Sequence, residues 1–75
     1  MKETTEKLPT SPDWATAPDW AQYFAIDKDG EGYFYYLEPF FYHIGFWNNQ
    51  CETSPKIAGV FDATNWENSL QKRPD

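Results

Sequence analysis

The stretch from residue 20 to residue 47 constrains this chain most, because it is dense in aromatic residues and is interrupted by one strong turn signal. It reads WAQYFAIDKDGEGYFYYLEPFFYHIGFW and holds twelve of the fifteen aromatic residues in the 75-residue sequence. Aromatic side chains suit the pleated surface of a sheet better than a helix. Asp29-Gly30 lies between two aromatic-rich runs, which is typical of a β-hairpin. The sequence therefore predicts a hairpin over residues 21–38.

A two-residue loop at Asp29-Gly30 would fix the register of that hairpin. It sets Phe24 opposite Tyr35, and it pairs Lys28 with Glu31, which carry opposite charges. In such a turn the glycine at position 30 takes a positive φ, so we expect Gly30→Val to cost about 1–2 kcal/mol or more. Gly32→Ala should cost less, about 0.5–1 kcal/mol.

The rest of the chain predicts a small α+β fold that is mainly β. Pro39 ends the hairpin, and residues 40–47 form a third strand. Residues 56–61 are short and apolar, so they form either a fourth strand or an ordered loop. Thr64 and Glu67 fit a capping box, which predicts a short C-terminal helix over residues 65–72. We therefore expect an antiparallel sheet of three to four strands that carries one helix.

The length allows one small domain, which we place at residues 12–75. Residues 1–11 are polar and contain Pro9, so they are expected to form a disordered or extended N-terminal arm. Trp14 follows this arm and is expected to fold back onto the sheet. Cys51 is the single cysteine and cannot form an internal disulfide.

Charge and composition exclude several classes of function. The formal net charge is −6, which disfavours direct binding of a nucleic-acid phosphate backbone and permits binding of a basic protein surface. No apolar run is long enough to span a bilayer, so no membrane segment is expected. His43 is the single histidine and has no partner to orient it as a base, so we expect no catalytic residues and no enzyme.

The hairpin region also fits the twelve-residue calcium loop of an EF-hand. Calcium prefers hard oxygen ligands, and the loop positions that supply them are occupied here. Pro18 and Pro39 leave little room for the flanking helices of an EF-hand, so calcium binding is an alternative to the hairpin. The ligands in that alternative are Asp27, Asp29, Glu31, Glu38 and the carbonyl of Tyr33.

A further alternative is a small aromatic sheet that binds a peptide or a small ligand. A three-stranded meander with Trp20, Tyr35, Tyr36 and Trp47 resembles the WW domain, which recognises proline-rich segments in an aromatic groove. The resemblance implies that these four side chains would line such a groove.

A broader resemblance covers nearly the whole chain. The motifs that carry it are Asp13-Trp14, Ala17-Pro18, Trp20-Ala21, Ala25-Ile26-Asp27, Asp29-Gly30, residues 33–36, Pro39, Gly45, Trp47, Trp66-Glu67, Ser69-Leu70 and Arg73-Pro74. This layout resembles small proteins of unassigned function encoded by tailed bacteriophages. The resemblance implies an accessory protein of the host bacterial cytoplasm that binds a host or defence protein, in some cases as a mimic of nucleic acid.

These observations favour an interaction protein. The predicted hairpin carries aromatic residues on both faces, and one helix cannot cover both, so an aromatic and acidic face is expected to bind a protein partner. We expect the contacts to come from Tyr23, Phe34, Tyr36 and Trp47. Self-association through the same face would make the protein a homodimer.

Overall fold

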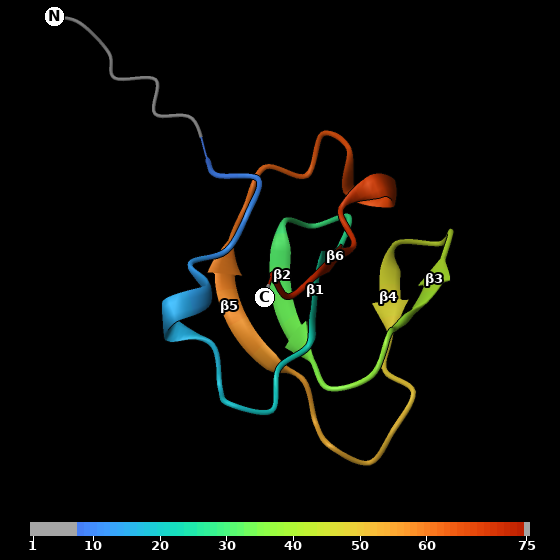
Figure 1. Cartoon of the computed structure of the whole chain (residues 1–75). Coiled ribbons are helices and arrows are strands. Elements are labelled where there is room, and N and C mark those ends of the chain that lie inside the picture. The colour runs from blue at the N-terminus through green and yellow to red at the C-terminus, as the bar shows by residue number, and fades with distance from the viewer. Residues whose placement is uncertain (1–7, 75) are drawn as a thin grey trace, which may run out of the picture.

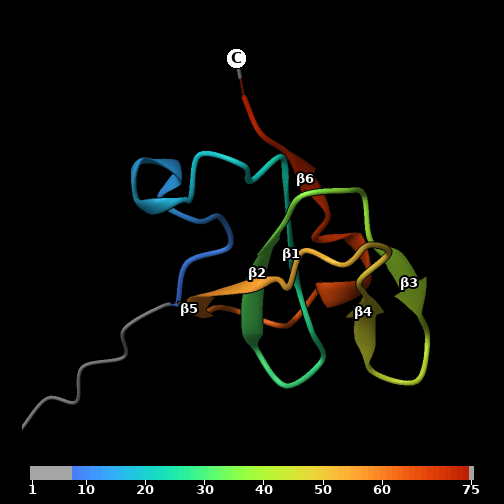
Figure 2. The ribbon, with the colours of Figure 1, turned by 90° about the horizontal axis from the view of Figure 1, so that it is seen from below.

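The computed structural model describes residues 8–74, which form two antiparallel sheets and two short 3-10 turns (Figure 1). The larger sheet has the strand order β5-β2-β1-β6, and the smaller one is a hairpin of β3 and β4. Figure 2 shows that this second hairpin stands beside the larger sheet, with β3 farthest from it. The elements are η1 (Trp14–Thr16), β1 (Tyr23–Ile26), β2 (Glu31–Tyr35), β3 (Phe40–Tyr42), β4 (Phe46–Asn48), β5 (Lys56–Val60), η2 (Trp66–Asn68) and β6 (Gln71–Lys72).

The expected hairpin is present as β1 and β2, but its register differs by one residue from the prediction. Phe24 faces Phe34, not Tyr35. The loop has three residues: Asp27 donates its backbone N–H to the carbonyl of Glu31, and Gly30 donates to the carbonyl of Asp27. Gly30 has a φ of 94°. Three-residue hairpin loops combine a type I turn with a following residue in the left-handed region, and Gly30 is that residue. The predicted charge pair between Lys28 and Glu31 is therefore not a cross-strand pair.

Both faces of this hairpin are buried. Phe24 and Phe34 lie on one face, Ala25 and Tyr35 lie on the other, and all four are at most 2% exposed. Gly32 sits opposite Ile26, and a Cβ there would lie only 2.6 Å from the Phe61 ring. Its role is therefore steric, and we expect Gly32→Ala to cost more than the sequence alone indicated.

The prediction of one strand over residues 40–47 is also wrong, because these residues fold into the hairpin β3–β4. Gly45 has a φ of 139° and donates its N–H to the carbonyl of Tyr42 at 3.1 Å. The loop of the first hairpin has the same two features: the N–H of its glycine bonds to the carbonyl three residues earlier, and that glycine has a positive φ. The prediction of a single strand thus missed the turn at Gly45 that reverses the chain.

The predicted C-terminal helix over residues 65–72 is wrong as well. The hydroxyl of Thr64 bonds to the carboxylate of Asp62, and the residue at the start of η2, Asn65, makes no side-chain cap. Residues 71–72 instead pair with β1 as β6. The ladder with β1 satisfies the backbone groups that the predicted helix would have paired within itself.

Ser69 explains how the chain changes from η2 to β6. Its hydroxyl oxygen accepts the backbone N–H of Ile26 at 2.8 Å, and the hydroxyl lies 2.7 Å from the carbonyl of Trp66. A side chain thus completes the β1 ladder where no strand runs beside it. The apolar run at residues 56–61 is a strand, β5, which resolves the alternative left by the sequence.

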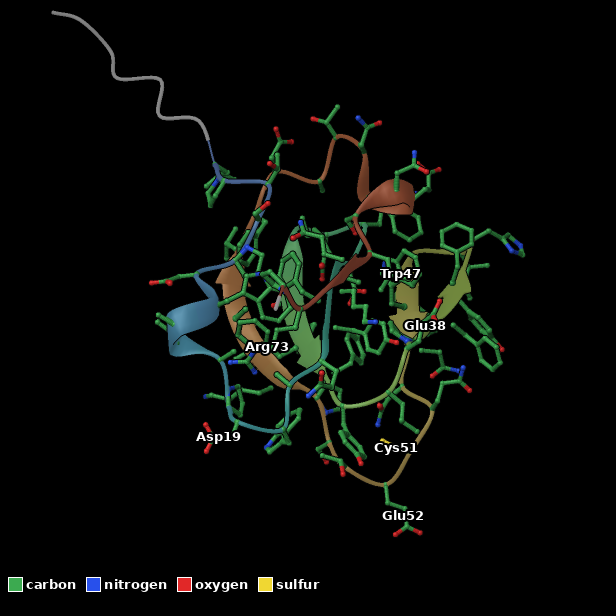
Figure 3. The ribbon with its side chains drawn as sticks, in the orientation of Figure 1. Asp19, Glu38, Trp47, Cys51, Glu52 and Arg73 are labelled. Carbon is green, nitrogen blue, oxygen red and sulfur yellow. The ribbon has the colours of Figure 1, made fainter. Side chains whose placement is uncertain are left out.

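Residues 9–14 pack against the C-terminal part of the described chain. Of the predicted arm, residues 1–7 lie outside the described residues, whereas Pro9 accepts the N–H of Asp62 at 2.8 Å. Trp14 packs on Phe34 with ring centroids 5.4 Å apart, which confirms that it folds back onto the sheet. The Arg73 guanidinium, labelled in Figure 3, lies 5.7 Å from the centroid of the Trp14 ring. None of the helical segments in residues 8–74 has the length and apolar character needed to cross a bilayer.

Candidate protein-interaction surface

The inner face of the hairpin β3–β4 packs on the core through Trp47, which is 8% exposed, whereas Phe41 beside it is 43% exposed. Phe41 and Trp47 are opposite each other in the register, and their ring centroids are 5.3 Å apart. Phe41 also lies 5.2 Å from the ring of Trp66. Opposite residues of a strand pair lie on the same face of the sheet. The face that carries Phe41 and Trp47 packs on η2 and on the end of β1.

Trp47 fixes the hairpin to the larger sheet. Its backbone N–H donates to Asp27 Oδ1 at 2.9 Å, and its indole Nε1 donates to the carbonyl of Ile26 at 3.0 Å. The Tyr35 hydroxyl donates to the Trp47 carbonyl at 3.4 Å. Lys28 donates its backbone N–H to Gly45, so the two loops also meet directly. These bonds hold the hairpin in one orientation.

The outer face of the same hairpin is apolar and exposed. Strand alternation puts Phe40, Tyr42 and Phe46 on the face opposite Trp47, and the rings of Tyr42 and Phe46 lie 5.1 Å apart. Ile44 projects from the loop between the strands. We call these four residues the hairpin patch; their exposed fractions are 58%, 44%, 66% and 38% in the order Phe40, Tyr42, Ile44, Phe46. Contiguous exposed apolar patches are typical of interaction sites, which makes the hairpin patch the candidate.

Charged groups stand beside the hairpin patch. A shallow hollow of about 540 Å³ lies between the two loops, lined by Ile44 and Phe46 on one side and by Asp27, Lys28 and Asp29 on the other. Glu38 is exposed two residues before Phe40. The apolar patch therefore has a border in which carboxylates outnumber the lysine.

The carboxylate of Asp27 has an altered protonation equilibrium. Burial raises its pKa above the ordinary value of 3.8, the bond from Trp47 N–H opposes this, and the charges of Asp29 and Glu31 raise the pKa further. The Tyr33 hydroxyl donates to Glu31 at 2.7 Å, and this bond raises the pKa of Tyr33 to about 12. The negative charges of Asp29 and Glu31 thus contribute to the raised pKa of both Asp27 and Tyr33.

The expected partner contacts are distributed unevenly. Phe34 is 1% exposed and Trp47 is 8% exposed, so both side chains are core residues with little surface to offer a partner. Tyr23 is half-buried, and Tyr36 is exposed just after β2. The hairpin patch was missed because residues 40–47 were interpreted as one strand. The signal that could have found it is a three-residue segment ending in glycine between two aromatic runs.

The structure does not assemble the five calcium ligands of the alternative hypothesis. Asp29 Oδ1 accepts the N–H of Glu31, and Glu31 accepts the Tyr33 hydroxyl, so these carboxylates bond within the loop. Residues 31–35 are an extended strand, which carries Glu38 away from Asp27 at about 3.3 Å per residue. Within residues 8–74, no group of three or more histidine, cysteine, aspartate or glutamate side chains is placed to hold a metal ion.

The aromatic groove implied by the WW-like layout is not formed. Tyr35 is 2% exposed, and it bonds to Trp47 in the core. Trp47 belongs to the second hairpin, so the three-stranded meander that the groove needs is absent from the described strands.

A second cavity has a volume of about 470 Å³. One apolar residue and eight polar residues line it: Ile26, Thr10, Ser11, Asp62, Thr64, Asn65, Asn68, Ser69 and Gln71. The Gln71 amide already donates to Thr10 and to Ser11. The cavity is thus framed by groups that bond the N-terminal segment to the C-terminal one.

No protein-family model, curated protein or solved structure matches this chain.

Proposed function

We propose that this protein binds another protein through the hairpin patch and that it acts by binding, without catalysis. The observation that carries the proposal is the arrangement of β3–β4. One face of the hairpin is anchored in the core through Trp47, and the other presents Phe40, Tyr42, Ile44 and Phe46 to solvent. A rigidly held aromatic surface loses little conformational entropy on binding, which favours affinity.

The charges define the partner. A complementary protein would carry an apolar centre and a border of lysine or arginine, opposite Asp29 and Glu38. The net charge of −6 would speed the encounter with such a surface at low salt. A host or defence protein of a bacterium is the partner class implied by the resemblance to small phage proteins, and the bacterial cytoplasm is the corresponding compartment.

Affinity capture with three matched baits tests the proposal. The baits are the wild-type protein, a patch variant with Phe40→Ser and Phe46→Ser, and a control with Ile57→Ser and Val60→Ser. The control changes two exposed apolar residues of β5, on the opposite side of the larger sheet. We expect one protein to be held by the wild type and the control and lost by the patch variant. Equal recovery on all three baits would contradict the proposal.

A further inference from the structure

The hollow between the two hairpin loops has one apolar wall and one charged wall. Ile44 and Phe46 form the apolar wall, and both belong to the hairpin patch. Asp27, Lys28 and Asp29 form the charged wall. The volume of about 540 Å³ lies within the roughly 300–1,000 Å³ range of pockets that take small ligands. The hollow therefore extends the hairpin patch towards the carboxylates of the first loop.

Hydrogen bonds hold the two walls of the hollow in place. Lys28 donates its backbone N–H to the carbonyl of Gly45 at 2.9 Å, so the two loops are joined directly. The stem of Lys28 also lies along Gly45, where a Cβ would be 3.8 Å from both the Cβ and the Cδ of Lys28. Asp27 Oδ1 accepts the backbone N–H of Trp47 at 2.9 Å, which fixes this carboxylate against β4. A guest side chain would thus enter a preformed site, and little of the protein would have to become ordered.

The charges of the hollow favour a cation as the guest. Asp27 and Asp29 carry negative charges and only Lys28 carries a positive one, so negative charge is in excess among the lining residues. Asp29 Oδ1 accepts the N–H of Glu31 at 3.0 Å, and a carboxylate has acceptor sites on both oxygens, so Asp29 can accept further bonds. Burial raises the pKa of Asp27, and the like charges of Asp29 and Glu31 raise it further. A cation in the hollow would relieve this repulsion.

We infer that the hollow takes one arginine side chain of the partner, with its guanidinium at Asp29 and its stem against Ile44 and Phe46. The inference rests on the proposed function, because this arginine belongs to the protein that covers the hairpin patch. Arginine buries its stem along apolar surface and keeps its charged end in water. Its planar guanidinium pairs with a carboxylate through two parallel bonds and stacks on aromatic rings, whereas the ammonium of lysine is a point charge. Carboxylates opposite an aromatic ring therefore favour arginine over lysine.

Amide chemical-shift titration of the full chain tests this inference with three capped tripeptides. The first has arginine between two leucines, and the other two have citrulline or lysine in place of the arginine. Citrulline keeps the shape of arginine and lacks its charge. We expect the arginine peptide to shift the amides of residues 27–29 and 44–46 and to bind in the millimolar range. The citrulline peptide should bind about two- to fivefold more weakly, which is the scale of one exposed ion pair, and the lysine peptide should also bind more weakly.

Two matched variants locate the charge that the peptide recognises. Asp29→Asn removes the charge and keeps an oxygen acceptor for the N–H of Glu31, so the turn is preserved. Asp13→Asn is the control, because Asp13 accepts the N–H of Ala15 at 3.0 Å in the same way, and η1 lies across the larger sheet from the second hairpin (Figure 1). Asp29→Asn should weaken the arginine peptide about two- to fivefold and leave the citrulline peptide unchanged. Asp13→Asn should bind both peptides like the wild type.

An arginine peptide that binds no more tightly than its two counterparts would overturn the inference. So would shifts confined to other parts of the protein, an equal loss in the two variants, or no saturable binding up to about 10 mM. Affinity capture reports separately on the proposed function. A partner that the wild type holds and the patch variant loses, together with peptides that do not bind the hollow, would overturn the arginine site alone. Peptides that bind as expected, together with equal recovery on all three baits, would contradict the proposed function and leave the arginine site standing.

Discussion

Trp47 donates its backbone N–H to the carboxylate of Asp27, 2.9 Å away and twenty residues earlier in the chain. Asp27 begins the loop of the first hairpin, and Trp47 lies in the middle strand position of β4. The bond therefore joins the two hairpins, and the orientation of the hairpin patch depends on it.

Removal of this acceptor should loosen the second hairpin. Asp27→Ala leaves the Trp47 N–H without its partner, and we expect a loss of about 1–2 kcal/mol in the free energy of unfolding. Urea unfolding followed by tryptophan fluorescence measures the change. Glu52→Ala is the control, because Glu52 is exposed and points away from the body of the protein (Figure 3), and it should stay within about 0.5 kcal/mol of the wild type. Equal stability of the Asp27 variant and the control would show that the bond does not hold the hairpin.

The raised pKa of Asp27 makes a prediction about pH. The folded state binds the proton more tightly than the unfolded state, whose pKa is near the ordinary value of 3.8. The resulting stabilisation is fully present below that pKa and is lost as pH rises through the raised folded pKa. Asp27→Asn keeps an oxygen acceptor for Trp47 and cannot titrate. The stability of the wild type relative to Asp27→Asn should therefore fall as pH rises from about 3 to about 7. A relative stability that rises over this range would contradict the burial of Asp27.

The packing at Gly32 predicts a coupled effect. Gly32→Ala places a methyl group 2.6 Å from Phe61 and 2.8 Å from Phe24, so we expect a loss of about 1–3 kcal/mol. Phe61→Leu removes part of the obstacle and should make the added methyl group less costly in the double variant. A double-mutant cycle with urea unfolding measures this coupling. Strict additivity would mean that Gly32 does not contact the Phe61 ring.

Two hydroxyls distinguish the observed C-terminal segment from the predicted helix. Ser69→Ala leaves the Ile26 N–H on the buried strand β1 without its acceptor, which should cost about 1–3 kcal/mol. Thr64 is exposed and caps no helix, so Thr64→Ala should cost less than Ser69→Ala. Thermal unfolding of both variants decides between the two structures, since a helix capped by Thr64 would reverse the order.

The sequence predicted the elements that depend on local chemistry. The first hairpin was predictable because Asp29-Gly30 and the flanking aromatic residues act within a few positions of each other. Its register was not, because the loop adds one residue, Lys28, whose backbone bonds to Gly45 on the second hairpin. The predicted helix failed for a similar reason: residues 71–72 complete the edge of β1, a partner more than forty positions away.

An exposed aromatic surface was predicted, but the exposed side chains are largely other residues than the predicted ones. Excess aromatic surface over what a small core can bury was the correct reason to expect an exposed patch. Alternation along a strand assigns side chains to two faces but does not say which face a second hairpin will cover. The β3–β4 hairpin covers Tyr35 with Trp47, and it leaves Tyr42 and Phe46 in water.

The proposed interaction is tested most directly by titration calorimetry of the captured partner with three proteins. These are the wild type, the Phe40→Ser and Phe46→Ser variant, and the Ile57→Ser and Val60→Ser control. Loss of a buried aromatic anchor costs about 2 kcal/mol or more, so the patch variant should bind at least about tenfold more weakly, whereas the control should bind like the wild type. Equal dissociation constants for all three proteins, or a loss confined to the β5 control, would contradict binding through the hairpin patch.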